Sequence, residues 1–299
     1  KTKGAYLVIG IMVMVLLSNF TSIMIPYFVG TNFLPLIGIS KITSISTLEE
    51  LKPLFDIGLE PLVQMEVAMF LALMVGLGIG LSNTNRYDNL LQSYTAFSRG
   101  FFEKVFIPTL PLYVWGTILK ISHETDIATM LPMFGEMIVL IVLTQLTYIT
   151  FLYYVGSGLN FKKAIDSIKN ALPSCVVGFS TMSSVVTMPV TLTAAEKNIS
   201  EDPQIARVAI STTVNCHDVG ECISLPMIAL TIYFINFGTF PPIETYLVFA
   251  MWVALAQFGG VSVPGGSIVI ILPFLSEHLN FNDEMTSLII ALSIFMDPV

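Results

Sequence analysis

The chain has little charge. Of its 299 residues, 11% are Asp, Glu, Lys or Arg, whereas 54% are apolar. A soluble domain carries about 25% charged residues, so this composition excludes an ordinary soluble fold. Charge-free runs such as 4–40, 137–161 and 245–276 exceed the length of about 20 residues that a helix needs to cross a bilayer. The sequence therefore predicts an all-α, multi-pass protein of the cell (inner or plasma) membrane.

Cysteine is also scarce, and other common site motifs are missing. Cys175, Cys216 and Cys222 have neither the spacing of a disulfide framework nor that of a metal cluster, so we expect reduced packing residues. The glycines of 76–80 lie in an apolar run without the strand that a phosphate-binding loop needs. We expect no cofactor, and no basic patch for nucleic acid is present.

The few charges alternate in sign along the chain. Basic residues gather in connections around 1–3, 86–104, 162–169 and 197–207, and acidic residues in connections around 49–60, 123–126 and 277–284. The positive-inside rule places the basic connections in the cytoplasm. The charge pattern agrees with this rule along the whole chain only if both ends of segment 160–197 lie in the cytoplasm. Both ends of segment 244–279 must then lie outside.

Both of these segments break at a tip of small residues and then resume. The first tip is Ser180-Thr181-Met182-Ser183-Ser184, before Pro189, and the second spans 259–266. A break at membrane depth is tolerable only where it is buried in protein or lines a wet cavity. Paired interrupted segments point to the binding site of a transporter. We therefore predict two re-entrant helical hairpins, inner 160–197 and outer 244–279, whose tips meet near the midplane.

The segment between them, 203–238, carries its own interruption. Within it His217, Asp218 and Glu221 lie in the middle of an otherwise apolar span. Each ionisable group at a helix centre costs about 2.5–3.5 kcal/mol on insertion scales. Such groups either pair with one another as structural contacts or form a site. Their position level with two broken hairpins favours a site, to which Asp297 adds another carboxylate.

Four motifs in this order resemble one known family, the dicarboxylate/amino acid:cation symporters, which include the excitatory amino acid transporters. Residues 181–190 are similar to the family's serine-rich inner tip followed by Thr-Leu-Pro-Val. Residues 215–218 fall where the family has Asn-Met-Asp-Gly-Thr, and 263–265 match its Val-Pro-Gly outer tip. Asp297 falls on the family's aspartate that binds the substrate amine.

The resemblance implies an elevator-type inverted-repeat transporter that assembles as a homotrimer in the lipid bilayer. It also implies a fragment that lacks the first two spans and the end of the last. On this mapping, 1–30 is a transport-domain span and 31–128 is the scaffold, or trimerisation, region. The transport-domain core is 129–299, with broken helix 203–238 and the start of the final helix at 282–299. The implied activity is symport of an amino acid or C4-dicarboxylate coupled to sodium, protons or both.

Broken helices bind anions at exposed N–H groups and cations at exposed carbonyls. By resemblance, the substrate-binding residues are Ser183, Ser184, Val185, Val219, Ser262, Val263, Gly265 and Asp297. Asp297 would pair with an ammonium group of the substrate. The Ser180 hydroxyl would only bond a backbone group at the helix break. The family selects acidic side chains with an arginine, either in the inner tip or three residues after the final-helix aspartate. The inner-tip position is Met182 here, and the other would lie beyond Val299. A neutral amino acid therefore remains an alternative substrate.

The resemblance also implies cation-binding residues, namely Ser18, Asn19, Thr213, Asn215, Asp218, Gln257, Phe258 and Gly260. His217 occupies the family's aspartate position. Sodium prefers hard oxygen ligands, whereas a histidine with an ordinary pKa of about 6.5 suits proton exchange. His217 and Glu221, four residues apart, would form either a proton relay or a structural pair. Sodium and proton coupling both stay open.

Two other function classes compete with transport. An intramembrane serine hydrolase would use Ser183 or Ser184 with His217, but neither serine lies in a Gly-x-Ser-x-Gly elbow, and a nucleophile needs a positioned base and an oxyanion site. An ion channel would show flux that ignores substrate saturation. We expect a transporter rather than an enzyme.

Overall fold

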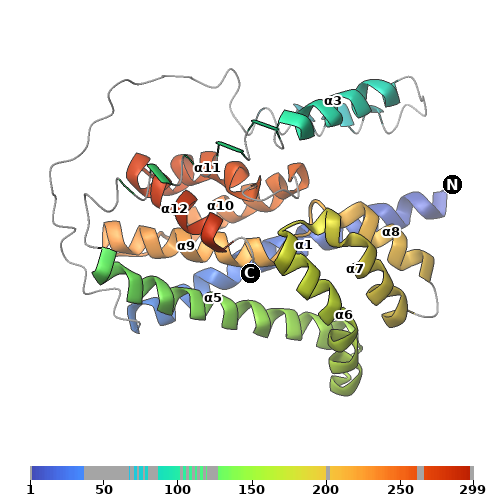
Figure 1. Cartoon of the computed structure of the whole chain (residues 1–299), viewed down its shortest axis with the longest axis horizontal. Coiled ribbons are helices and arrows are strands. Elements are labelled where there is room, and N and C mark those ends of the chain that lie inside the picture. The colour runs from blue at the N-terminus through green and yellow to red at the C-terminus, as the bar shows by residue number, and fades with distance from the viewer. Residues whose placement is uncertain are drawn as a thin grey trace. The chain divides into compact units, whose positions relative to one another are not determined.

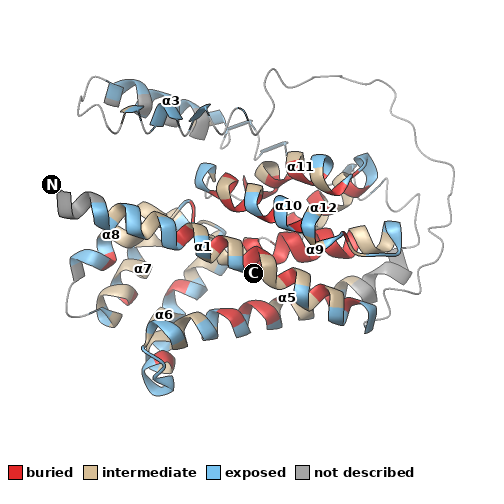
Figure 2. Ribbon diagram, turned by 180° about the vertical axis from the view of Figure 1, so that it is seen from behind, coloured by how far each residue is buried: buried red, intermediate tan, exposed pale blue. Residues whose placement is uncertain are grey.

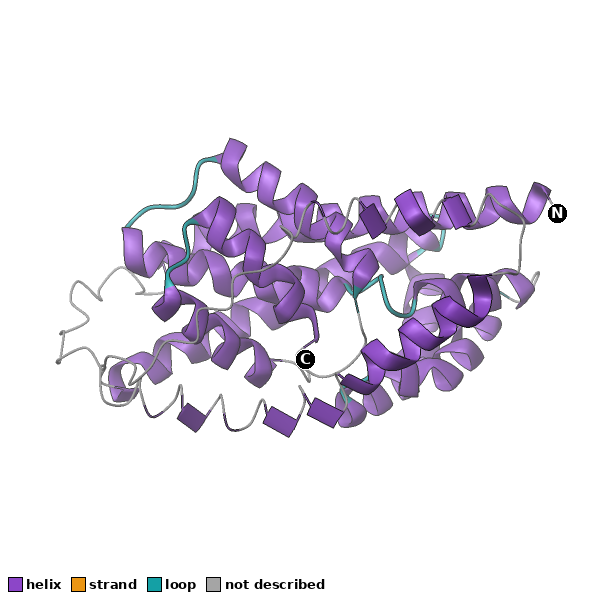
Figure 3. Cartoon of the chain, turned by 90° about the horizontal axis from the view of Figure 1, so that it is seen from above, coloured by secondary structure: helices purple, strands orange, loops and turns teal. Residues whose placement is uncertain are grey.

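The computed structural model describes residues 2–36, 127–199, 203–260 and 266–296, together with parts of 67–119 (Figure 1). The chain divides into two compact units, Lys1–Thr43 with Asp126–Val299, and Ser44–Thr125. Figure 3 shows helices joined by loops, and the described residues contain no strand. The prediction of an all-α fold is confirmed for this part of the chain.

Helices α1 (Thr2–Phe33) and α5 (Ile127–Gly156) are the longest in the first unit. A short 3-10 turn, η1 (Leu34–Leu36), continues α1. Segments Tyr6–Leu36 and Phe134–Gly156 are long and apolar enough to span a membrane. Much of their apolar surface is exposed, with Tyr6 at 75% and Met14 at 72%. Such faces are suited to contact with lipid, so the structure supports a helical membrane protein.

Helix α9 (Val219–Phe237) forms the centre of this unit. It contacts α1, α5, α11 and α12, and its residues from Cys222 to Ile232 are buried, as Figure 2 shows in red. A helix that is apolar all round lies in a protein core or spans a membrane, and α9 is enclosed by the other helices. Because lipid is as apolar as these side chains, close van der Waals packing holds the helices together.

Helices α6 (Phe161–Thr181) and α7 (Ser184–Asn198) pack against each other as a pair. Met182, between them, has a left-handed conformation with φ 50°. The opposite end of the pair is closed by Asn198, whose Oδ1 accepts a bond from Asn170 Nδ2 at 2.8 Å and whose Nδ2 donates to the Ser167 carbonyl at 3.2 Å. The pair is thus fixed at its base and broken at its tip.

Helix α8 (Pro203–Thr213) packs on α7 and leads into α9. Proline at the first helical position loses no hydrogen bond, because that N–H has no intrahelical partner. An ion pair of 2.6 Å between Arg207 Nε and Glu196 Oε1 joins α8 to α7. The segment 203–238 is therefore two helices, separated by the turn 214–218.

The last part of the unit comprises α10 (Ile243–Ala256), η5 (Gln257–Gly259), α11 (Gly266–Leu279) and α12 (Asp283–Met296). Helices α10 and α11 pack together. The Tyr246 hydroxyl donates to the Ile23 carbonyl of α1 at 2.7 Å, and the Tyr27 and Tyr246 rings lie 4.7 Å apart between centroids. Residues 261–265 and 297–299 lie outside the described residues.

In the second unit, the longest described helix is α3 (Asp88–Phe101). Its large exposed apolar side chains include Leu90, Tyr94 and Phe97. Most of the predicted scaffold region, 31–128, lies outside the described residues. The domain boundaries of the sequence analysis therefore stay a prediction.

Candidate functional site

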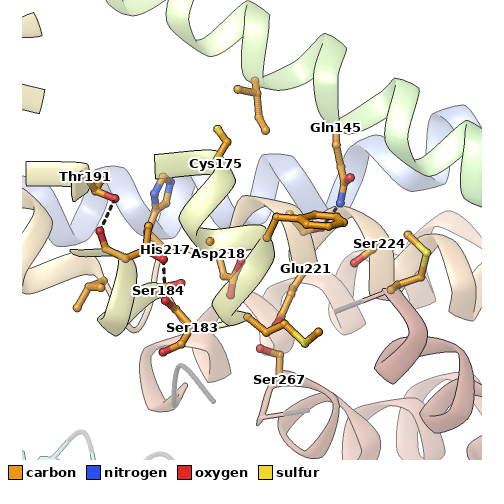
Figure 4. Close-up of a pocket in the computed structure, with 18 of the residues that line it drawn as sticks. Gln145, Cys175, Ser183, Ser184, Thr191, His217, Asp218, Glu221, Ser224 and Ser267 are labelled. Carbon is orange, nitrogen blue, oxygen red and sulfur yellow. Dashed lines mark hydrogen bonds between the residues drawn. The ribbon is translucent and has the colours of Figure 1, made fainter. Parts of the chain in front are cut away.

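A cavity of about 630 Å³ lies where the α6–α7 break faces the turn before α9. Its walls come from α5, α6, α7, α8, α9, α11 and α12. Its polar lining includes Gln145, Ser183, Ser184, His217, Asp218, Glu221, Ser224 and Ser267, which Figure 4 labels. Ligand pockets commonly measure about 300–1,000 Å³, so this cavity has the size of a small-molecule site.

The 182–183 break is stabilised by residues close to it in sequence. Ser183 caps α7, because its hydroxyl accepts a bond from the Val186 N–H at 3.4 Å. Thr187 Oγ1 donates back to the Ser183 carbonyl at 2.9 Å, and the Met182 N–H donates to the Gly178 carbonyl at 2.8 Å. The break is therefore a local structure, with the first turn of α7 beginning at the cavity wall.

The 214–218 turn is stabilised partly from within. The Thr213 carbonyl accepts N–H bonds from Cys216 at 3.0 Å and from His217 at 2.9 Å. Two bonds occupy both lone pairs of this carbonyl. Thr213 was predicted as a cation ligand, and its backbone oxygen would have to release a turn bond to serve as one.

Three polar side chains of α1 and α5 support this turn and the start of α9. Asn19 of α1 donates Nδ2–H to the Cys216 carbonyl at 2.7 Å. Ser18 Oγ lies 3.0 Å from His217 Nε2, and Gln145 of α5 donates to the Gly220 carbonyl at 3.0 Å. Buried backbone groups require such partners. The broken helix is thus held in place by α1 and α5.

Asn19 has an oxygen that none of the described residues satisfies. The side chain is fully buried, and its Oδ1 has no hydrogen-bond partner within the described part of the chain. The oxygen and nitrogen of this amide cannot exchange places, because the Cys216 carbonyl requires the N–H donor. Leaving a buried acceptor unsatisfied costs about 1–3 kcal/mol. The atom is therefore well suited to bind a cation or a donor.

Gly260 lies directly against the same turn. A Cβ added to it would lie 2.7 Å from the Asn215 carbonyl oxygen and 2.9 Å from the Gln257 carbonyl oxygen. Both atoms are backbone, so no side chain fits there. The end of η5 and the 214–218 turn are thus in close contact, and this contact brings together two of the predicted cation-binding residues.

The predicted residues fall into four groups. Those that line the cavity are Ser183, Ser184, Thr213, His217, Asp218 and Glu221. Those that surround the 214–218 turn are Ser18, Asn19, Asn215 and Gly260, while Val185, Val219, Gln257 and Phe258 do not line the cavity. Ser262, Val263, Gly265 and Asp297 lie outside the described residues.

The structure alters the interpretation of His217. It precedes α9 rather than lying within it, so the helical spacing that would place it against Glu221 does not apply. Its hydrogen bond goes to Ser18 instead. The same bond engages the Nε2 atom of the ring, which leaves Nδ1 as the other ring nitrogen. Ser180 bonds the Val176 carbonyl at 2.8 Å, as expected of a backbone contact.

The sequence analysis missed several polar lining residues, of which Gln145 is the most informative. It is 4% exposed and bonds the first turn of α9. A carboxamide inside the apolar run 137–161 was a visible signal, because polar groups in a span need a partner. Ser224, Ser267 and Ser293 also line the cavity. A single hydroxyl is too common in helices to have identified them.

Comparison with known proteins agrees with these features. The model of the sodium:dicarboxylate symporter family matches residues 3–299. An excitatory amino acid transporter of Onchocerca volvulus is 21% identical over 247 residues, covering 79% of this chain and 48% of the relative. The chain thus spans about half the length of this curated relative. Because the family model matches nearly the whole chain, the protein belongs to the sodium:dicarboxylate symporter family.

Proposed function

We propose that the protein is a secondary active symporter that moves an amino acid or a C4-dicarboxylate across the membrane, coupled to sodium, protons or both. The observation that carries this proposal is the cavity shared by the two helix breaks. It combines a helix start at Ser184 with the carboxylates of Asp218 and Glu221. Such a site offers groups for a substrate anion and for cations together.

The helix start supports binding of a substrate carboxylate. The first N–H groups of a helix have no intrahelical partners and carry partial positive charge. Helix α7 begins at the cavity wall with Ser184, and Val185 follows it in the same turn, so a carboxylate would bind at their N–H groups. Helix α9 also begins here, but Glu221 already provides negative charge in its first turn. The α7 start is therefore the better anion site.

The charge of the cavity supports coupling to cations. Its described lining includes Asp218 and Glu221 but neither lysine nor arginine. An anionic substrate beside two carboxylates needs compensating positive charge, which sodium ions, protons or a substrate ammonium would supply. Asp297 would bind that ammonium, with Ser262, Val263 and Gly265 opposite Ser183, as proposed from the family resemblance.

Asn19 is the best candidate for a sodium ligand. Its buried Oδ1 is a hard oxygen with no hydrogen-bond partner among the described residues, and the 214–218 turn adjoins it through the Cys216 carbonyl. Hard oxygens are the ligands that sodium prefers. The nearby carbonyls of Asn215 and Gly260 would add further oxygens. Movement as an elevator within a homotrimer completes the proposal.

The test is uptake by the full-length protein in proteoliposomes, with sodium and proton gradients imposed separately. Radiolabelled aspartate, succinate and alanine represent the acidic amino acids, C4-dicarboxylates and neutral amino acids. We expect saturable uptake of one class that requires an inward cation gradient. Flux that does not saturate would instead indicate a channel. Ester hydrolysis without uptake would indicate the serine hydrolase.

A second candidate is a neutral amino-acid symporter driven mainly by protons, which the contact between His217 and Ser18 favours. In this candidate, the His217 imidazole would carry a proton. In the family, an aspartate at the same position would bind a cation instead. Replacing His217 with Asp should then shift the coupling from protons to sodium while substrate binding persists. If H217D leaves the proton-driven and sodium-driven components unchanged, His217 has no role in coupling.

A further inference from the structure

A second cavity, of about 580 Å³, lies at the end of the α6–α7 pair away from the Met182 tip. It is formed by the start of α6 and the end of α7, near the end of α5. Asn198, whose bonds to Asn170 and Ser167 close the base of the pair, is part of its wall. The proposed transport mechanism makes no use of this cavity.

The cavity is rich in positive charge. Lys162, Lys163 and Lys197 line it, and no carboxylate in the described residues lies within ion-pair distance of them. Its one acidic lining residue, Asp166, is paired with Lys169 at 3.7 Å. Three lysines in one concavity repel one another unless an anion is bound. Asp166 is the one carboxylate of the lining against three lysines, so the cavity keeps an excess of positive charge.

The start of α6 adds neutral donors to this charge. Asn160 Oδ1 accepts the Lys163 N–H at 3.1 Å, so it caps one N–H group in the first turn. The remaining N–H groups at a helix start have no intrahelical partners and favour phosphate. Lysine ammonium groups with backbone N–H donors form a setting that suits a tetrahedral, doubly charged anion.

We propose that this basal cavity, lined by Lys162, Lys163 and Lys197, binds a phosphate group. The phosphate belongs to an anionic lipid headgroup or to a soluble phosphate compound, since both present the same oxygens. The positive-inside rule assigns these lysines to the cytoplasmic side, where anionic lipids concentrate and basic pockets between helices bind headgroups. The site is separate from the substrate cavity and goes beyond the proposed symport.

The test compares two double variants of the full chain in detergent. K163Q/K197Q removes two charges from the basal cavity. K104Q/K120Q removes two lysines of the second compact unit, neither of which belongs to the lining of the cavity, so the net charge is matched. Dioctanoyl phosphatidic acid and inorganic phosphate are titrated separately by isothermal calorimetry. Equal helix content and thermal midpoints without ligand show that both variants are folded.

We expect K163Q/K197Q to weaken binding by roughly thirtyfold, because each lysine near an anionic surface contributes about a fivefold factor. K104Q/K120Q should stay within about twofold of the parent chain. Binding of phosphatidic acid alone would identify a lipid headgroup, and similar binding of both probes would identify the phosphate group itself. Equal weakening in both variants, or no binding of either probe to the parent chain, would overturn the proposal.

Discussion

The two helix breaks at the substrate cavity are stabilised in different ways. At 182–183, the hydrogen bonds come from residues within a few positions, such as Val186 and Thr187. At 214–218, the side-chain partners Asn19 and Ser18 lie 197 and 199 positions away in sequence. The first break forms with its own helix pair. The second break requires α1 and α5 to be in place, so its geometry depends on tertiary packing.

The largest expected effect comes from Gly260→Ala. The added methyl would meet two backbone carbonyls at under 3 Å, so the 214–218 turn must move. We expect a loss of about 3 kcal/mol of stability, at the upper end for overpacking, and loss of sodium-dependent uptake. Gly259→Ala is the matched control, because none of the described residues lies within 4 Å of its Cβ position. Thermal unfolding and sodium-dependent uptake are measured for both variants. Equal effects of the two substitutions would disprove the close contact at Gly260.

Asn19→Ala should have the next largest effect. It removes the donor to the Cys216 carbonyl and the buried Oδ1, so we expect a loss of about 2 kcal/mol and a weaker apparent sodium affinity. Asn32→Ala is the control, since exposed Asn32 bonds only within α1. Sodium titration of uptake checks the ligand role. An unchanged sodium dependence would restrict Asn19 to a structural contact.

Gln145→Leu tests the support from α5 at similar side-chain volume. The Gly220 carbonyl would lose its donor, and we expect a loss of about 1–2 kcal/mol with a reduced maximal uptake rate. Thr147→Val is a suitable control, because its hydroxyl bonds only the Leu143 carbonyl within α5. If both variants unfold at the same temperature, α5 does not stabilise the turn.

The smallest effect is expected at the local break. Ser183→Ala removes the cap of α7, which typically contributes about 1 kcal/mol. Ser180→Ala removes only an exposed bond within α6 and should change stability by a few tenths of a kcal/mol at most. Calorimetry in detergent compares them. A larger loss for S183A than for N19A would reverse the contrast between the two breaks.

The sequence predicted the positions of both breaks because small and polar residues interrupt apolar runs. Met182, Ser183 and the turn near Asn215 illustrate this. The apolar pattern did not reveal which distant side chains complete each break, because hydropathy identifies spans but not their rotation against neighbours. The pairing of His217 with Ser18 and the role of Gln145 therefore emerged only from the packed helices. The outer tip and the domain boundaries remain predictions.

The hydrogen bond from Tyr246 to the Ile23 carbonyl limits how the molecule can move. Both residues are fully buried, and the bond lies close to Pro26, which removes an N–H from the α1 ladder. Sliding α10 along α1 would break this bond and leave the buried Tyr246 hydroxyl without its acceptor, at a cost of about 1–3 kcal/mol. We therefore expect these two helices to move together. A hinge on the α10 side is then expected beyond Ala256, where η5 and its glycine begin.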